Sequence, residues 1–133
     1  MKVFVVDTHV LVWWLEANPK LPLSVQKLLD DTDTDLHLPA IVVLELVDLC
    51  LKGRTALTLD PVLALLRDES RFVVLDLTAE LVFLTAKCAS LPDIHDRCIV
   101  ATTAKLREMQ RDTVLITRDQ AIRKSGLVPT MWD

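Results

Sequence analysis

A short, wholly apolar run that ends at a carboxylate constrains this chain more than any other feature. Residues 3–6 are Val-Phe-Val-Val, and Asp7 follows them directly. Because the run does not alternate with polar residues, it predicts a strand that is buried on both faces, as in a parallel sheet. Asp7 and Thr8 are both good helix caps, so a short helix is expected next. Ligands bind at the carboxyl ends of such strands, which makes Asp7 a candidate site residue.

Further short apolar runs follow, and helical patterns separate them. The expected strands cover residues 3–6, 36–39, 72–75 and 113–117, with a candidate fifth strand at 128–132. The expected helices after the first cover residues 24–31, 40–52, 60–69, 78–89, 94–109 and 119–124. Asp60 and Thr78 are the expected caps of two of these helices.

This alternation of strands and helices predicts the fold class. It indicates an α/β protein with a central, mostly parallel sheet of four to five strands and helices on both faces, a three-layer α/β/α sandwich. No repeat, low-complexity tract or long linker divides the chain. Residues 1–133 are therefore expected to form a single domain.

The overall charge argues against one class of function. With 15 Lys and Arg against 19 Asp and Glu, the net charge is -4, which is not typical of a protein that binds nucleic acid through bulk electrostatics. The segment 95–124 is locally basic, however, since it holds seven Lys and Arg against four acidic residues. Either a basic surface or ordinary solvated helix faces would explain this segment.

The cysteines and the hydropathy of the chain indicate the cellular compartment of the protein. Three cysteines, Cys50, Cys88 and Cys98, are widely spaced without a Cys-x-x-Cys pair, so reduced thiols are expected. No stretch approaches the roughly 20 uncharged residues of a membrane span, and the first apolar run is too short for a signal peptide. We therefore expect a cytoplasmic protein without a membrane partner.

Four carboxylates are candidates for one site. Asp7 and Asp119 follow strands that should end at the same edge of the sheet. Asp96 lies at the start of the helix over 94–109, and Glu45 lies within the apolar helix over 40–52. If the four converge, their charges repel one another, and a hard divalent cation relieves that repulsion. Oxygen-only ligands favour Mg²⁺ or Mn²⁺ over zinc, and such ions promote phosphodiester hydrolysis by activating water.

Most of these carboxylates also have a purely structural interpretation. Asp7 and Asp119 could serve only as helix caps, and Asp93 and Asp96 compete for one N-cap. No single position is specific, so the hypothesis depends on the four carboxylates being found together.

Glu45 and the two neighbouring histidines have alternatives of their own. Glu45 forms a stripe with Asp48 and Lys52 that could be only the solvated side of a helix, in which Asp48 and Lys52 are a stabilising i, i+4 pair. His9 and His95 adjoin two of the candidate ligands. Hydrolysis by metal-bound water does not require a histidine, so we interpret both as bordering the site.

Four short motifs surround the candidate carboxylates, and their order and spacing extend along essentially the whole chain. They are Asp7-Thr8-His9-Val10-Leu11-Val12-Trp13, Val43-Leu44-Glu45-Leu46, Asp93-Ile94-His95-Asp96-Arg97-Cys98-Ile99-Val100-Ala101-Thr102 and Leu115-Ile116-Thr117-Arg118-Asp119. Together they resemble the motifs of PIN-domain ribonucleases, and among these the VapC-type toxins of type II toxin–antitoxin pairs. The chain departs from the family's pattern in two places. Pro39 and Val42 stand where many relatives carry serines, and Ile94-His95 replaces a common Pro-Phe or Pro-Ala.

The resemblance implies a PIN-like fold and a metal-dependent endoribonuclease that acts as a toxin. It assigns the Mg²⁺ or Mn²⁺ ions to Asp7, Glu45, Asp96 and Asp119. Candidate rim or substrate residues are Thr8, Thr117, Arg97 and Arg118, of which the two arginines could instead form ion pairs with the same acids. The implied partners are an RNA substrate, a VapB-like antitoxin and a second copy of the chain in a homodimer.

Several alternatives remain open from the sequence. One is a PIN-fold RNA-processing nuclease without an antitoxin. A haloacid-dehalogenase-type phosphotransferase needs a second Asp where this chain has His9. A receiver-like signalling domain would use Asp76 after the third strand, but the early acidic pair of such domains is missing. A non-catalytic binding module is the last alternative, and the intact set of four acids counts against it.

Overall fold

The five strands of the computed structural model form one fully parallel sheet. The structure describes residues 2–109 and 111–133. The strands are β1 (Lys2–Val6), β2 (Leu36–Pro39), β3 (Phe72–Leu75), β4 (Asp112–Ile116) and β5 (Thr130–Met131), in the spatial order β3-β2-β1-β4-β5. The helices are α1 (Thr8–Leu15), α2 (Leu23–Asp30), α3 (Ala40–Leu51), α4 (Leu59–Asp68), α5 (Ala79–Leu84), the 3₁₀ helix η1 (Thr85–Cys88), α6 (Ile94–Glu108) and α7 (Gln120–Ser125).

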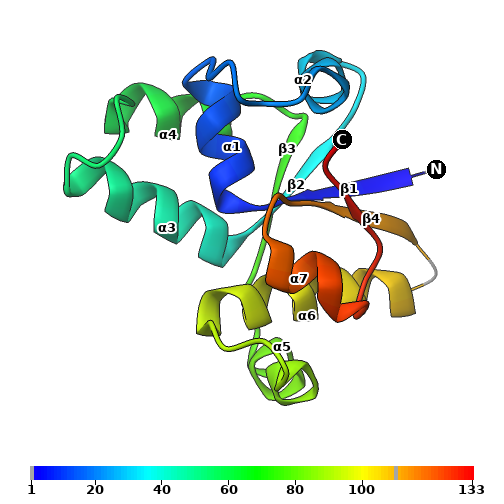
Figure 1. The fold of residues 1–133 in the computed structure, drawn as a ribbon. Helices are drawn as coiled ribbons and strands as arrows, with labels where there is room; N and C mark the ends of the chain where they lie inside the picture. The colour runs from blue at the N-terminus through cyan, green and yellow to red at the C-terminus, as the bar shows by residue number, and fades with distance from the viewer. Residues whose placement is uncertain (1, 110) are drawn as a thin grey trace.

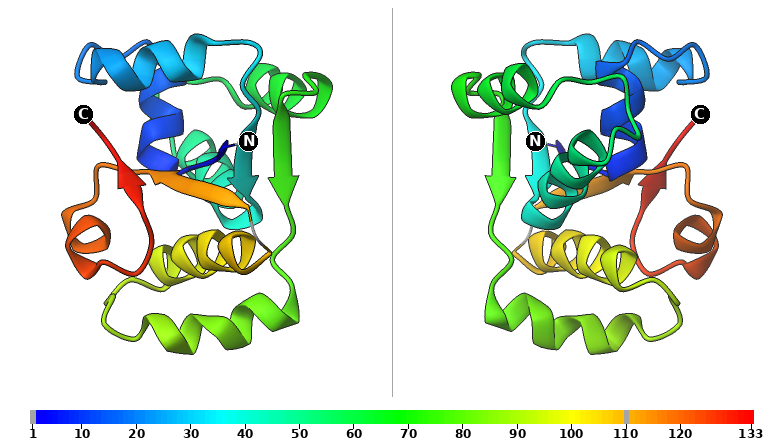
Figure 2. Two further views of the ribbon diagram at one scale, coloured as in Figure 1. Left: turned by 90° about the vertical axis from the view of Figure 1, so that its right-hand side faces the viewer. Right: turned by 90° about the vertical axis from the view of Figure 1, so that its left-hand side faces the viewer.

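Helices cover both faces of this sheet. Figure 1 shows α1, α3 and α4 together on one side of the strands and α5 and α6 on the other. Both side views show α5 outside α6, farther from the sheet (Figure 2), so α6 is the helix that packs against β4. The predicted three-layer α/β/α sandwich with a parallel sheet is therefore confirmed, and the sheet has five strands.

The central strands carry the core, as their uninterrupted apolar runs predict. Val5 and Val6 of β1 and Leu115 and Ile116 of β4 are fully buried. Strand β3 lies at one edge of the sheet, where Val74 stays 46% exposed. Burial thus decreases from the middle of the sheet to its edge, and the carboxyl ends of β1 and β4 stand above the best-packed part of the domain.

Two details of the predicted helices differ from the structure. Asp60 is not the cap of its helix, because α4 begins at Leu59 after Thr58. The Asp60 carboxylate lies instead in the first turn, where its negative charge interacts favourably with the positive end of the helix dipole. The helix expected over 78–89 begins as predicted, with the Leu81 amide donating to the Thr78 hydroxyl at 3.2 Å. It then tightens from α5 into η1 where the Thr85 hydroxyl donates to the Val82 carbonyl.

The structure bears on the predictions about the cysteines and about membrane spans. Cys50, Cys88 and Cys98 are all free thiols, and Cys88 and Cys98 are buried. Within the part of the chain that the structure describes, every helix is too short or too polar to cross a membrane.

Candidate active site

The candidate site lies at the carboxyl ends of β1 and β4, which are neighbours in the sheet. Val6 is in register with Ile116, and the Asp7 amide donates to the Ile116 carbonyl at 3.0 Å. This pairing brings Asp7 beside Thr117, 110 positions later in the sequence. Both side chains are buried, with Asp7 only 4% exposed and Thr117 not exposed at all.

Both carboxylate oxygens of Asp7 accept hydrogen bonds. The Thr8 amide donates to Oδ1 at 2.7 Å, so Asp7 is the N-cap of α1, and the Thr117 hydroxyl donates to Oδ2 at 2.6 Å. Burial raises the pKa of Asp7 above its usual value, although these two hydrogen bonds and His9 lower it and the Asp119 charge raises it further. A buried carboxylate held in this way has a fixed orientation but little access to water.

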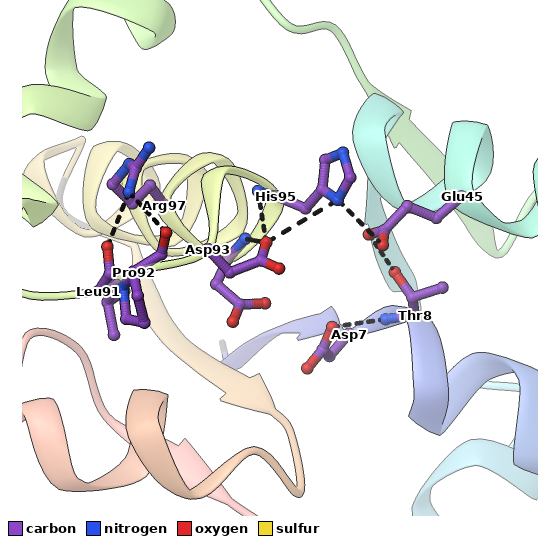
Figure 3. A network of polar contacts seen from close by, with 9 residues as sticks. Asp7, Thr8, Glu45, Leu91, Pro92, Asp93, His95 and Arg97 are labelled. Atoms are coloured by element: carbon purple, nitrogen blue, oxygen red, sulfur yellow. Dashed lines mark hydrogen bonds and ion pairs between the residues drawn. The ribbon is translucent and has the colours of Figure 1, made fainter.

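Thr8 connects Asp7 to Glu45. Its hydroxyl donates to Glu45 Oε1 at 2.8 Å, while its amide binds Asp7. The second oxygen of Glu45 lies 3.5 Å from Nδ1 of His95. Figure 3 shows these side chains bridging the start of α1, the middle of α3 and the start of α6. The structure therefore brings Glu45 toward Asp7 through hydrogen-bonded intermediaries.

The competition between Asp93 and Asp96 for one helix cap is resolved. Asp93 is the N-cap of α6, since its Oδ1 accepts from the amides of His95 at 2.7 Å and Asp96 at 3.1 Å. The Asp96 side chain is thereby left for another role. The pKa of Asp96 is raised to about 7, chiefly by burial and in addition by the negative charges of Asp119, Asp93, Asp7 and Glu45.

These charge effects identify which predicted residues are brought together. The motifs predicted four site carboxylates, one of which is Asp96. The charges of the other three, Asp7, Glu45 and Asp119, all raise its pKa. Asp119 is in addition the N-cap of α7, because its Oδ1 accepts from the Ile122 amide at 2.9 Å. Its amide donates to the Thr117 hydroxyl at 3.0 Å, which connects it to Asp7. Both proposed roles of Asp119, cap and member of the acidic group, are therefore compatible.

The two candidate arginines differ in position. Arg97 points away from the carboxylates, and its Nη1 donates to the backbone carbonyls of Leu91 at 2.8 Å and Pro92 at 3.2 Å (Figure 3). It thus holds the loop that precedes α6. Arg118 is exposed between Thr117 and Asp119, and its guanidinium carbon lies 4.4 Å from the centroid of the Trp13 ring. Arg118 is accordingly the better placed of the two to meet a ligand.

The structure also shows contacts that the sequence did not predict. Thr117 was expected only at the rim, yet its hydroxyl joins Asp7 to Asp119. The contact of His95 with Glu45 was likewise not foreseen. A hydroxyl residue directly after a buried strand, next to a candidate acid, is the sequence signal that could have identified Thr117.

The residues can be tested for their fit to a divalent cation. Among residues 2–109 and 111–133, no three His, Cys, Asp or Glu side chains lie close enough together to hold a metal ion. The donor chemistry nevertheless fits, since carboxylate oxygens are the ligands that Mg²⁺ and Mn²⁺ prefer. After burial, the charges of four neighbouring carboxylates contribute to the raised pKa of Asp96, and a cation would neutralise those charges.

Comparisons with known proteins agree with this architecture. The sequence model of one protein family, the PIN domain, matches residues 4–126. Among solved structures, VapBC2 from Rickettsia felis bound to a promoter DNA fragment is similar with a TM-score of 0.70 and 16% identity, covering 100% of both chains. FitAcB from Neisseria gonorrhoeae has a TM-score of 0.64 and 21% identity, covering 97% of this chain and 96% of its own. DNA-bound VapBC from Salmonella typhimurium has a TM-score of 0.64 and 16% identity, covering 98% of each chain. A comparison with curated proteins gave no match.

Proposed function

Because this chain belongs to the PIN domain family, we propose that it is a metal-dependent endoribonuclease and the toxin of a type II toxin–antitoxin pair. One observation carries the proposal: carboxylates from four separate parts of the chain act on a single aspartate, Asp96, and raise its pKa. Capping alone does not require these carboxylates to lie near one another, and repulsion between close carboxylates opposes folding. A charge arrangement of this kind is typical of functional sites.

The carboxylates divide the proposed chemistry among them. Asp7, Glu45, Asp96 and Asp119 would hold Mg²⁺ or Mn²⁺. When bound, the ion would activate a water and stabilise the negative charge of the phosphodiester under attack. Thr117 and Thr8 are positioning residues, because their hydroxyls fix Asp7 and Glu45.

Cationic groups beside the acids suit an RNA backbone. Arg118 is exposed and held against Trp13 by a cation–π contact. A depression of about 440 Å³ beyond Asp119 is lined by Gln120, Arg123, Lys124 and Thr130. A chain with a net charge of -4 needs such local groups to contact phosphates. These positions would guide a single strand along α7 toward the acids.

The toxin role is supported by family and fold. Solved structures with the same fold include the VapBC complexes and FitAcB. From the similarity to these complexes we infer that a small VapB-like antitoxin neutralises this chain, and from the resemblance of its motifs to VapC-type toxins we infer that it acts as a homodimer. A PIN-fold nuclease that processes RNA without an antitoxin is the alternative.

Cleavage of RNA is the first test. The purified protein should cut single-stranded RNA oligonucleotides in Mg²⁺ or Mn²⁺, and a chelator should stop the reaction. Asp7→Asn and Asp96→Asn should both abolish cleavage, while Asp76→Asn, an exposed carboxylate outside the acidic group, should retain it. Unchanged cleavage by folded Asp96→Asn would contradict the site. Loss of activity in Asp76→Asn, with formation of an acyl phosphate there in the wild type, would favour the receiver-like alternative.

Partnership is tested separately. Expression of the chain alone should arrest bacterial growth, and co-expression of a small protein encoded beside it should restore growth and co-purify with it. Growth arrest that depends on Asp96 but is not relieved by any neighbouring gene product would favour the RNA-processing alternative.

A further inference from the structure

A cavity of about 360 Å³ opens directly beside the acidic group. Its walls are formed by Thr8 and His9 of α1, His95 of α6, and Leu44, Glu45, Asp48 and Leu49 of α3. Glu45 belongs both to this wall and to the proposed metal ligands, so the cavity and the acidic group are continuous. Whatever fills the cavity lies next to the position at which the proposed cleavage takes place.

The lining combines flat, apolar and acceptor groups. The imidazole rings of His9 and His95 are solvent-accessible, and Leu44 is 61% exposed although it is a large apolar side chain. Nucleobases that are unstacked from single-stranded RNA bind on such rings and apolar side chains, with their edges hydrogen-bonded to polar groups. The cavity thus has the chemistry of a base-binding pocket.

Asp48 would decide which base fits. Its side chain is 55% exposed, one helical turn after Glu45, and Lys52 contacts its Oδ2 at 2.9 Å. Each carboxylate oxygen has two acceptor sites, so Asp48 can keep Lys52 and still accept from a ligand. Guanine presents two adjacent donors, N1–H and the N2 amino group, to a carboxylate. Adenine and cytosine each present one donor beside an acceptor, and uracil presents one donor between two carbonyls.

We propose that this cavity binds a guanine base of the RNA next to the scissile phosphodiester, with Asp48 as the residue that determines specificity. This inference rests on the proposed ribonuclease function, because it names the substrate feature that the same site would select. Lys52 contacts Oδ2 of Asp48, and the carboxylate keeps further acceptor positions for the base. His9 and His95 then border the base, which explains why exposed rings flank the acidic group without being needed for hydrolysis.

Nucleoside binding tests the inference without any cleavage. The chain has three histidines, His9, His37 and His95, of which His37 is buried in β2 and does not line the cavity. In proton NMR spectra, guanosine should shift the ring signals of His9 and His95 and leave those of His37 unchanged. Uncharged nucleosides are used so that the acidic group does not repel a phosphate. Guanosine should bind at least about fivefold more tightly than uridine, since two hydrogen bonds to one base edge are discriminating.

Two variants separate recognition from general damage. Asp48→Asn should reduce the preference for guanosine to within about twofold, because an amide offers only one acceptor atom. Asp68→Asn, an exposed carboxylate at the end of α4, should keep the wild-type preference. Equal binding of all four nucleosides by the wild type, or no shift of His9 and His95, would overturn the inference. If guanosine shifted neither His9 nor His95, the cavity would instead be assigned to a side chain of a protein partner.

Cleavage of RNA with a randomised sequence supplies the second measurement. The wild type and Asp68→Asn should favour guanine at one fixed position beside the cut, and Asp48→Asn should lose that preference. Cleavage without any base preference at that position would overturn the guanine assignment while leaving the nuclease function intact. Guanosine binding by a protein that cuts no RNA would instead count against the proposed function and leave the base pocket standing.

Discussion

Replacing Asp96 by asparagine should stabilise the metal-free protein at neutral and alkaline pH, although it should abolish the proposed activity. The pKa of Asp96 is raised from 3.8 to about 7 by burial and by neighbouring carboxylates. Folding therefore favours the protonated carboxyl, and ionisation opposes folding. Stability is highest below the unfolded-state pKa near 4. It falls as the pH rises toward the folded-state pKa near 7, and it levels off above that pH.

The size of the effect follows from the two pKa values. A difference of about three pH units corresponds to roughly 4 kcal/mol in the free energy of unfolding. Asp96 is only partly buried, so solvent and salt screen its neighbours and about 1–2 kcal/mol is a better expectation. A chain of 133 residues unfolds with an entropy near 280 cal/mol/K, which makes 1 kcal/mol worth roughly 3–4 °C. Asp96→Asn should accordingly raise Tm by about 4–7 °C.

Thermal unfolding followed by circular dichroism in a chelator, from pH 4 to pH 8, would measure this gain. The advantage of Asp96→Asn over the wild type should be near zero at pH 4, grow through pH 5 to 7 and then stay constant. Saturating Mg²⁺ should shrink or reverse it, because the wild type alone binds the ion. Asp76→Asn, which removes an exposed carboxylate outside the acidic group, should change Tm by less than about 2 °C at every pH. If Asp96→Asn proved less stable than the wild type at pH 8 in chelator, the argument from crowded charges would be refuted.

Three further predictions concern the support of the site. Thr117→Val removes the donor to Asp7 and should lower Mn²⁺ affinity about 10–100-fold in calorimetric titrations, with a stability loss of about 1–2 kcal/mol in urea; unchanged affinity would show that this hydroxyl does not position Asp7. Mg²⁺ at about 100 times its Kd should stabilise the wild type by roughly 2.7 kcal/mol in thermal unfolding and leave Asp7→Asn unaffected; an equal gain in both would place the ion elsewhere. Leu11→Ala, at a fully buried position in α1, should cost about 2–5 kcal/mol in urea unfolding, and a loss below 1 kcal/mol would contradict the packing described for that helix.

Much of the fold follows from local pattern. The apolar run over 3–6 predicts β1 because a strand buried on both faces has no polar side to display, and the structure places Val5 and Val6 at full burial. The placement of Asp7 at the end of that strand is equally local. The four-acid hypothesis needed the motifs as well, since each acid alone has a structural explanation. The structure supports it only to the extent that the charges of Asp7, Glu45 and Asp119 act on Asp96, and the role of each acid in metal binding and catalysis stays a prediction.

Other features could not be predicted because they depend on distant partners. The bond from Thr117 to Asp7 joins residues 110 positions apart, and only the pairing of β1 with β4 brings them together. The predicted cap of α4 was wrong because Asp60 followed by Pro61 suits a helix start in general, whereas the helix begins at Leu59 after Thr58, without a side-chain cap to mark its start in the sequence. Local spacing also gives no information on which oxygen of Glu45 faces Thr8 and which faces His95.

The pairing of β1 with β4 has a consequence for protein synthesis. Ribosomes release the chain from its amino terminus, so β1, Asp7 and Glu45 emerge well before β4 delivers Thr117 and Asp119. Until then, the central strand of the sheet lacks one of its two neighbours, and Asp7 lacks the hydroxyl that orients it. Under the proposed function, a nascent chain would thus be inert toward RNA, including the RNA of the ribosome that makes it, until nearly all of its residues have been translated.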